Sequence, residues 1–213
     1  MKTPINILLV GPSGAGKGTQ AKLLAERYDL RHLQSGELLR KIVAKDDEFG
    51  RKVKDAMQKG FVPSEWIFKM IKEEFSRLGN TGVVIDGFSR KLPEIEMLYD
   101  VLGEHERKLN YIFLLELDDE KVIDRLINRR VCSACKKVFD SRSLKDKNIC
   151  PLCGEQVYTR EDDNLESIKN RLGDYKTETS KVIDFIKNRD SIIVIDGDRS
   201  INEVFEDICD KIK

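Results

Sequence analysis

The sequence predicts a three-layer α/β fold with a five-stranded parallel sheet between helices. Five short runs of β-branched and apolar residues alternate with stretches of helical periodicity, which is the pattern of repeated βαβ units. Three of the runs are continuously apolar, as strands buried on both faces of a parallel sheet are. The expected strands span residues 5–10, 32–34, 83–85, 111–117 and 192–195.

Helical patterns fill the segments between these strands, with apolar residues recurring every three or four positions. Two segments break the alternation and are interpreted as insertions into one core. The first, 35–62, is helical throughout, and the second, 125–163, has little periodicity at its centre. The expected helices span residues 16–27, 37–44, 65–78, 120–128, 164–188 and 201–212.

Composition excludes several classes of protein. The chain has 213 residues, of which 40% are hydrophobic, and a chain of this size can bury a hydrophobic core without disulfides or metals to stabilise it. Its 38 basic and 38 acidic residues cancel, whereas proteins that coat nucleic acid or anionic membranes usually carry a basic excess. The apolar runs are far shorter than the ~20 residues of a membrane span, and no signal-peptide pattern is present. We expect a cytoplasmic protein without nucleic-acid or membrane partners.

A phosphate-binding loop follows the first expected strand. Gly11 to Lys17 fits G-x-x-x-x-G-K and opens a helix, which is the context that a P-loop requires. Its glycines allow backbone N–H groups to point into one concavity, and the helix N-terminus adds partial positive charge. Lys17 is expected to reach the β- and γ-phosphates of a nucleotide. An ordinary glycine-rich turn is the alternative, and the position between strand and helix argues against it.

The residue after Lys17 departs from many P-loops. Nucleotide-hydrolysing switches carry Ser or Thr there, and its hydroxyl ligates Mg²⁺, but this chain has Gly18 with Thr19 one position later. We therefore expect Mg²⁺, bound together with ATP, to be held through water by Asp86 at the end of the strand 83–85.

Four cysteines form two C-x-x-C pairs separated by 14 residues: Cys132, Cys135, Cys150 and Cys153. Four thiolates at this ribbon-like spacing close a tetrahedral shell, which predicts a structural Zn²⁺. Two disulfides, disfavoured in a reducing compartment, and an iron centre are the alternatives. Cys209 lies among apolar residues of the last helix and is expected to be a packing residue.

Five motifs occur in an order that resembles one enzyme family across nearly the whole chain. Together they are similar to the nucleoside monophosphate kinases, and in particular to adenylate kinases of the long-lid, zinc-bearing bacterial type. The motifs are GAGKGTQ at 14–20, SGELLR at 35–40, DGFSR at 86–90, Asp124-Arg125 with Arg129-Arg130, and TREDD at 159–163 with Arg171.

The resemblance implies an enzyme with a P-loop core and two moving parts. The core would comprise residues 1–34, 63–124 and 164–213. The segment 35–62 would be a helical insertion that binds the nucleoside monophosphate, and 125–163 a zinc-ribbon-like lid over ATP. The reaction would be ATP + AMP ⇌ 2 ADP, with these nucleotides as the partners of a monomeric protein.

The same resemblance assigns roles to individual residues, and phosphoryl transfer suits them because it needs positioning and positive charge. The catalytic group would be Lys17, Arg90, Arg129, Arg160 and Arg171. ATP would contact Gly14, Ala15, Gly16, Lys17, Gly18, Thr19, Arg125, Arg129, Val138, Phe139 and Arg199. AMP would contact Ser35, Arg40, Gly60, Phe61, Val62, Gly87, Phe88, Ser89, Arg90, Glu94, Arg160 and Arg171.

Two departures from the family pattern concern the acceptor base. Ser89 replaces the family's Pro, and Glu94 replaces a Gln that reads adenine with both halves of its amide. A carboxylate only accepts hydrogen bonds, so Glu94 matches two donors of guanine better than adenine. A neutral Glu94, its pKa raised by burial, could donate instead. We expect AMP as the main acceptor, with specificity relaxed toward GMP.

Two other classes of protein share single features with this sequence. A P-loop nucleotide switch would require Ser or Thr directly after Lys17. A zinc-ribbon protein that binds nucleic acid would fit the basic residues near the cysteines, but the zero net charge argues against it. Those basic residues are Lys136, Lys137, Arg142, Lys145 and Lys147.

Overall fold

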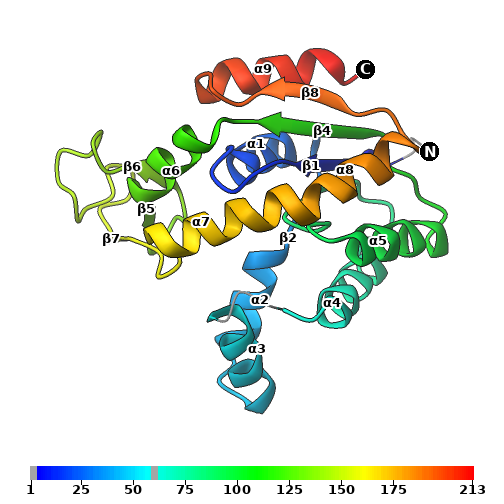
Figure 1. Ribbon diagram of the computed structural model, residues 1–213, viewed down its shortest axis with the longest axis horizontal. Helices are drawn as coiled ribbons and strands as arrows, with labels where there is room; N and C mark the ends of the chain where they lie inside the picture. The colour runs from blue at the N-terminus through cyan, green and yellow to red at the C-terminus, as the bar shows by residue number, and fades with distance from the viewer. Residues whose placement is uncertain (1–3, 59–61) are drawn as a thin grey trace.

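The computed structural model describes residues 4–58 and 62–213. Its central parallel sheet has the strand order β2-β3-β1-β4-β8, which confirms the predicted five-stranded sheet. Figure 1 shows the strands lying between helices. The strands are β1 (Asn6–Val10), β2 (Arg31–Gln34), β3 (Val83–Asp86), β4 (Tyr111–Glu116) and β8 (Ile193–Asp196).

Helices cover both faces of the sheet. No helix within the described ranges has both the length and the apolar character needed to cross a bilayer. The helices are α1 (Lys17–Tyr28), α2 (Ser35–Val43), α3 (Glu48–Gln58), α4 (Ser64–Ser76), α5 (Leu92–Glu104), α6 (Asp119–Ile127), α7 (Leu165–Asp174), α8 (Ser180–Lys187) and α9 (Ile201–Lys211).

Alternate residues of the buried strands pack into two separate hydrophobic clusters. Ile7 and Leu9 of β1 face a cluster that includes residues of α1 and α9. Leu8 and Val10 face the larger cluster, to which α4, α5 and α8 contribute. Neighbouring residues of a strand point to opposite faces of the sheet. A strand covered by helices on both faces must therefore be apolar at successive positions, as β1 is from Ile7 to Val10.

The carboxyl ends of three adjacent strands meet at one edge of the sheet. Asp86 at the end of β3 is in register with Leu9 of β1 and with Gln34 of β2. The loop after β1 therefore lies beside the ends of β2 and β3. Parallel α/β sheets bind ligands outside this edge, where neighbouring connections leave in opposite directions.

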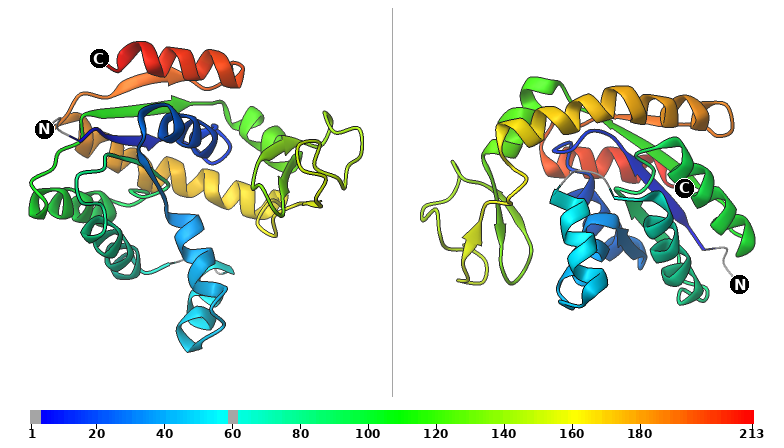
Figure 2. Two further views of the ribbon diagram at one scale, coloured as in Figure 1. Left: turned by 180° about the vertical axis from the view of Figure 1, so that it is seen from behind. Right: turned by 60° about the horizontal axis from the view of Figure 1, so that its bottom comes forward.

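Two parts of the chain extend from this core. The helices α2 and α3 project away from the sheet (Figures 1 and 2). At the end of α6 the chain enters a small antiparallel sheet of order β6-β5-β7, for which the sequence predicted no strands. These strands are β5 (Arg129–Cys132), β6 (Val138–Asp140) and β7 (Val157–Tyr158).

The long helix predicted over 164–188 is interrupted. A π-helical segment, Tyr175–Thr179, separates α7 from α8. Thr179 is buried there, and its hydroxyl donates a hydrogen bond to the backbone oxygen of Arg90, 3.1 Å away. Such π-turns occur often at functional sites, and this one lies against the loop that follows β3.

Candidate active site and metal centre

The phosphate loop has backbone conformations that only glycine adopts easily. Gly11 leaves β1 with φ 143°, and a Cβ atom there would lie 2.3 Å from the backbone oxygen of Leu115. Gly16 begins α1 with φ 92°. The glycine pattern of the sequence therefore produces a tight loop that ends at the N-terminus of α1, where an anion is favoured.

Lys17 folds back over this loop. Its Nζ donates hydrogen bonds to the backbone oxygens of Gly11 and Pro12, both at 2.8 Å. The pKa of the Lys17 ammonium is lowered to about 8, chiefly because burial disfavours its charged form; Asp86 opposes this shift, and three nearby arginines contribute to it. The negative charge around the buried ammonium is thus too small to balance the nearby cations, and phosphate groups would supply more.

Those arginines belong to one cluster of cations. Arg90, Arg129 and Arg171 all act on Lys17. Burial lowers the pKa of Arg160 to about 10, and Arg129 and Arg40 reinforce the effect. The structure therefore gathers the predicted catalytic residues, together with Arg40, from α2, the loop after β3, β5, the end of the lid and α7. A polyanion is the complement of such a cluster.

A buried carboxylate, Asp163, orders two members of this cluster. Arg129 donates from Nε and Nη2 to the two carboxylate oxygens at 2.7 and 2.6 Å, and Arg171 Nη2 lies 3.3 Å from one of them. The Asp163 side chain is 0% exposed. The bidentate geometry fixes the guanidinium plane. Asp163 belongs to the motif at 159–163, but no local sequence pattern indicates that it binds two arginines.

The predicted acceptor residues surround the loop after β3. Ser35 donates its hydroxyl hydrogen to the backbone oxygen of Gly87 at 2.6 Å, which ties the start of α2 to this loop. Ser89 is buried with φ 72° and an Oγ without a hydrogen-bond partner. Proline cannot adopt this φ, so the loop departs here from the form that the family's Pro would require.

Glu94 caps helix α5. Its Oε2 accepts hydrogen bonds from the backbone N–H groups of Arg90 and Lys91, at 2.8 and 3.3 Å. The side chain is buried. A carboxylate oxygen has two lone pairs, so Oε2 is fully used. This corrects the expectation that both oxygens of Glu94 are available to a guanine.

The remaining predicted contacts lie around this centre. Arg125 Nη2 is 3.6 Å from an Asp198 oxygen, and Arg199 pairs with Asp207 of α9. Val138 is exposed, whereas Phe139 packs in the lid. Val62 packs against the larger core cluster, and Phe88 is buried. Gly60 and Phe61 lie outside the described residues.

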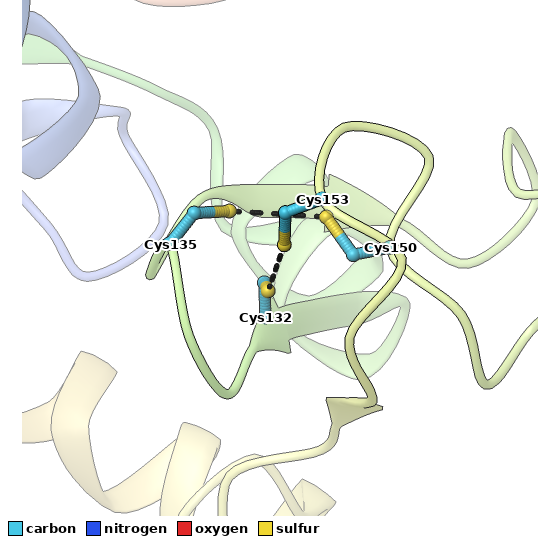
Figure 3. A group of neighbouring side chains, drawn as sticks. All are labelled: Cys132, Cys135, Cys150 and Cys153. Carbon is cyan, nitrogen blue, oxygen red and sulfur yellow. Dashed lines mark hydrogen bonds between the residues drawn. The ribbon is translucent and has the colours of Figure 1, made fainter.

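The four cysteines converge at one point of the lid (Figure 3). The sulfur of Cys132 lies 3.4 Å from that of Cys153, and Cys135 and Cys150 are 3.8 Å apart. All four sulfurs lie within 4.8 Å of one another, close to the ~3.8 Å expected around a tetrahedral Zn²⁺ with bonds of ~2.3 Å. Each of the four cysteines is free in this structure, and the convergence of all four sulfurs favours a metal site over two disulfides.

Comparison with known proteins assigns the family. A sequence model described as adenylate kinase matches residues 9–191. The chain belongs to the adenylate kinase family. It is 38% identical to an adenylate kinase of Clostridium perfringens, with 97% of this chain and 96% of the relative covered. It is 39% identical to one from Elusimicrobium minutum, with 95% of each covered, and 36% to one from Kosmotoga olearia, with 96% and 97% covered.

Family membership makes this chain a nucleoside monophosphate kinase, a phosphotransferase. The predicted resemblance is confirmed, and with it the predicted α/β fold. A purely nucleotide-sensing switch and a nucleic-acid-binding zinc ribbon are not favoured. The roles of individual residues stay predictions. The clustering of the predicted catalytic cations around Lys17 supports theirs.

We predict that nucleotide binding protonates Lys17. With its pKa near 8, Lys17 is about half neutral at pH 8 and about a tenth neutral at pH 7, and bound phosphates favour the charged form. MgATP binding should take up about half a proton at pH 8 and weaken as the pH rises further. Calorimetry in buffers of different ionisation enthalpy measures this uptake. A Lys17→Arg variant, which stays charged, should abolish it, and equal uptake in both proteins would contradict the assignment.

Proposed function

We propose that the protein transfers the terminal phosphoryl group of ATP to AMP and forms two molecules of ADP. The observation that carries this proposal is the cluster of Lys17 and five arginines at the carboxyl edge of the sheet. Five parts of the chain beyond the P-loop supply its arginines, so the cluster suits two phosphate-bearing substrates that meet end to end.

The transfer needs no general base, because the AMP phosphate is already an anionic nucleophile. One of its oxygens forms a bond to the γ-phosphorus while the bond to the β–γ bridging oxygen breaks, and ADP leaves with that electron pair. Arg40 and Arg90 hold the acceptor phosphate. Arg129, Arg160 and Arg171 neutralise charge on the transferring group, an effect that reaches on the order of 10³–10⁵ in rate for a single arginine.

The Mg²⁺ that accompanies ATP supplies further positive charge to the β- and γ-phosphates. Asp86 is suited to hold this ion through its water shell. Its carboxylate is buried at the end of β3 and acts electrostatically on Lys17. Oxygen ligands and retained water molecules are typical of Mg²⁺ sites.

We infer that residues 35–62 and 125–163 move against the core. Arg40 comes from the first segment, and Arg129 and Arg160 from the second, so the cation cluster is complete only when both lie over the P-loop. Lys22 of α1 donates a hydrogen bond to the Lys136 backbone oxygen of the lid at 3.2 Å. Closure that requires both substrates keeps water from attacking ATP.

The geometry of Glu94 favours adenine over guanine at the acceptor site. With Oε2 engaged by the start of α5, Oε1 is the oxygen left to accept a hydrogen bond from adenine N6. The bidentate contact that would reward guanine N1–H and N2–H₂ is not available. AMP is therefore the acceptor that this site supports best, without the relaxation toward GMP expected from the sequence.

We propose that the four cysteines hold a structural Zn²⁺. The buried cluster of the lid consists of Cys132, Leu144, Cys150 and Val157, and Phe139 packs against it. Two of its four buried members are thus candidate ligands, which leaves too little apolar volume for an independent core. A closed shell of four thiolates would replace that core and offer no position for catalysis. Localisation in the cytoplasm and a monomeric state remain predictions from the sequence.

The proposed function predicts ADP formation that requires both ATP and AMP. We expect kcat/KM for AMP to exceed that for GMP, CMP and UMP by at least about tenfold, a difference of ~1.4 kcal/mol, in a coupled assay for ADP. Lys17→Ala should keep the fold, checked by circular dichroism, and lose more than nine tenths of kcat. Absence of AMP-dependent turnover, or a faster reaction with GMP, would contradict the proposal.

Two substitutions of Glu94 separate its roles. Glu94→Ala removes the cap of α5 and should cost about 1 kcal/mol, which lowers the melting temperature by roughly 2–4 °C for a chain of this size. It should also raise KM for AMP but not for ATP. Glu94→Gln keeps an oxygen that can accept from Arg90 and Lys91, so its melting temperature should match the wild type. An unchanged Glu94→Ala variant would refute the cap.

Zinc removal should unfold the lid before the core. We expect one zinc per chain by elemental analysis. Cys135→Ser should lose the metal, add an early melting transition and abolish turnover, because structural zinc contributes roughly 10–16 kcal/mol in isolated fingers. Cys209→Ala, a cysteine outside the cluster, is the matched control and should keep its zinc. Metal-free protein with unchanged melting and activity would contradict this role.

A further inference from the structure

Gln34 contacts the carboxylate that is suited to hold the metal. It is the last residue of β2 and pairs in register with Asp86 of β3. Its side-chain Nε2 donates a hydrogen bond to Asp86 Oδ2 at 2.7 Å. Because the amide nitrogen is the donor, this contact orients both groups: Oδ2 faces Gln34, and Oδ1 is left for another partner.

The same amide fills the space next to Gly18. A Cβ atom built on Gly18 would lie 2.9 Å from Gln34 Nε2 and 3.2 Å from Asp86 Oδ2. A serine or threonine hydroxyl at this position ligates Mg²⁺ in other P-loop proteins. In this chain a side chain at residue 18 would force the Gln34 amide to shift away from its present contact with Asp86. Gly18 therefore leaves room for the Gln34–Asp86 pair as it stands.

We propose that Gln34 is a positioning residue for the metal of the nucleotide complex. By holding Oδ2 of Asp86, it directs Oδ1 toward the water shell of a divalent cation on the ATP phosphates. The amide thus occupies the space of the missing P-loop hydroxyl, but it acts on the metal through Asp86 rather than as a ligand. The proposal rests on the proposed use of metal-bound ATP, and it concerns ATP binding alone.

A donor at this place has a specific advantage. A second carboxylate beside Asp86 would repel both Asp86 and the incoming phosphates, and a lysine would add a cation next to Lys17. A neutral amide orders Asp86 without changing the charge of the site. Partners that hydrogen-bond to metal-binding groups typically change metal affinity by 10–100-fold when removed.

The test measures metal affinity separately from turnover. Mn²⁺ binding to the protein–ATP complex is followed by electron paramagnetic resonance, in the absence of AMP. Gln34→Met keeps the length of the side chain and removes the donor, and we expect Mn²⁺ affinity to fall about tenfold. The affinity for ATP with EDTA present should stay within about twofold. Gln58→Met, at the exposed end of α3, is the matched control and should change neither.

A double-mutant cycle shows whether Gln34 acts through Asp86. Asp86→Asn alone should weaken Mn²⁺ binding, and adding Gln34→Met should weaken it no further. Additive losses would overturn the positioning role, as would a Gln34→Met protein with wild-type Mn²⁺ affinity or one that loses stability alone. Because no acceptor is present, these results stand apart from the test of AMP as the substrate.

Discussion

Repulsion among the cations around Lys17 is the constraint on which the rest of the structure depends. Lys17 is buried with Arg90, Arg129 and Arg171 acting on it, and Arg160 is affected in the same way by Arg129 and Arg40. Such a cluster is costly without an anion. Asp163 offsets part of the cost by binding Arg129 and Arg171. Phosphate groups of bound nucleotides would offset the rest.

The sheet supplies the fixed half of this arrangement. Three strands end side by side, and their last residues or the loops after them carry Lys17, Gln34 and Asp86. The two-sided apolar core holds these ends rigidly. The lid, by contrast, has a cluster built around two of its own cysteines. The molecule therefore joins a well-packed scaffold to a lid with a much smaller apolar cluster, two members of which are candidate metal ligands.

The sequence predicted the features that repeat or follow a spacing rule. Each strand of the main sheet lies within one residue of its predicted bounds, because alternation and the P-loop are local signals. Helix α5 was missed, although Ile95, Leu98, Val101 and Leu102 have helical spacing. The lid strands β6 and β7 have three and two residues, too few for alternation to appear.

The functional details that the sequence missed are contacts between distant residues. The cap on α5 was hidden because Lys91, at the N-cap, is not one of the residues that mark a helix start. The bond from Gln34 to Asp86 spans 52 positions, and no local pattern encodes it. The burial of Asp163 likewise follows from the lid and α7 coming together.

The π-helical segment between α7 and α8 sets the phase of the whole helix. A π-turn inserts one extra residue, and each residue of an α-helix rotates the chain by about 100°. Arg171 on α7 thereby points to the cation cluster while Val182 and Ile186 on α8 stay buried against the core. A continuous α-helix could not direct both sets of side chains to these two different surroundings. The extra residue lets one helical rod present Arg171 to the cation cluster and also pack its C-terminal half against the core.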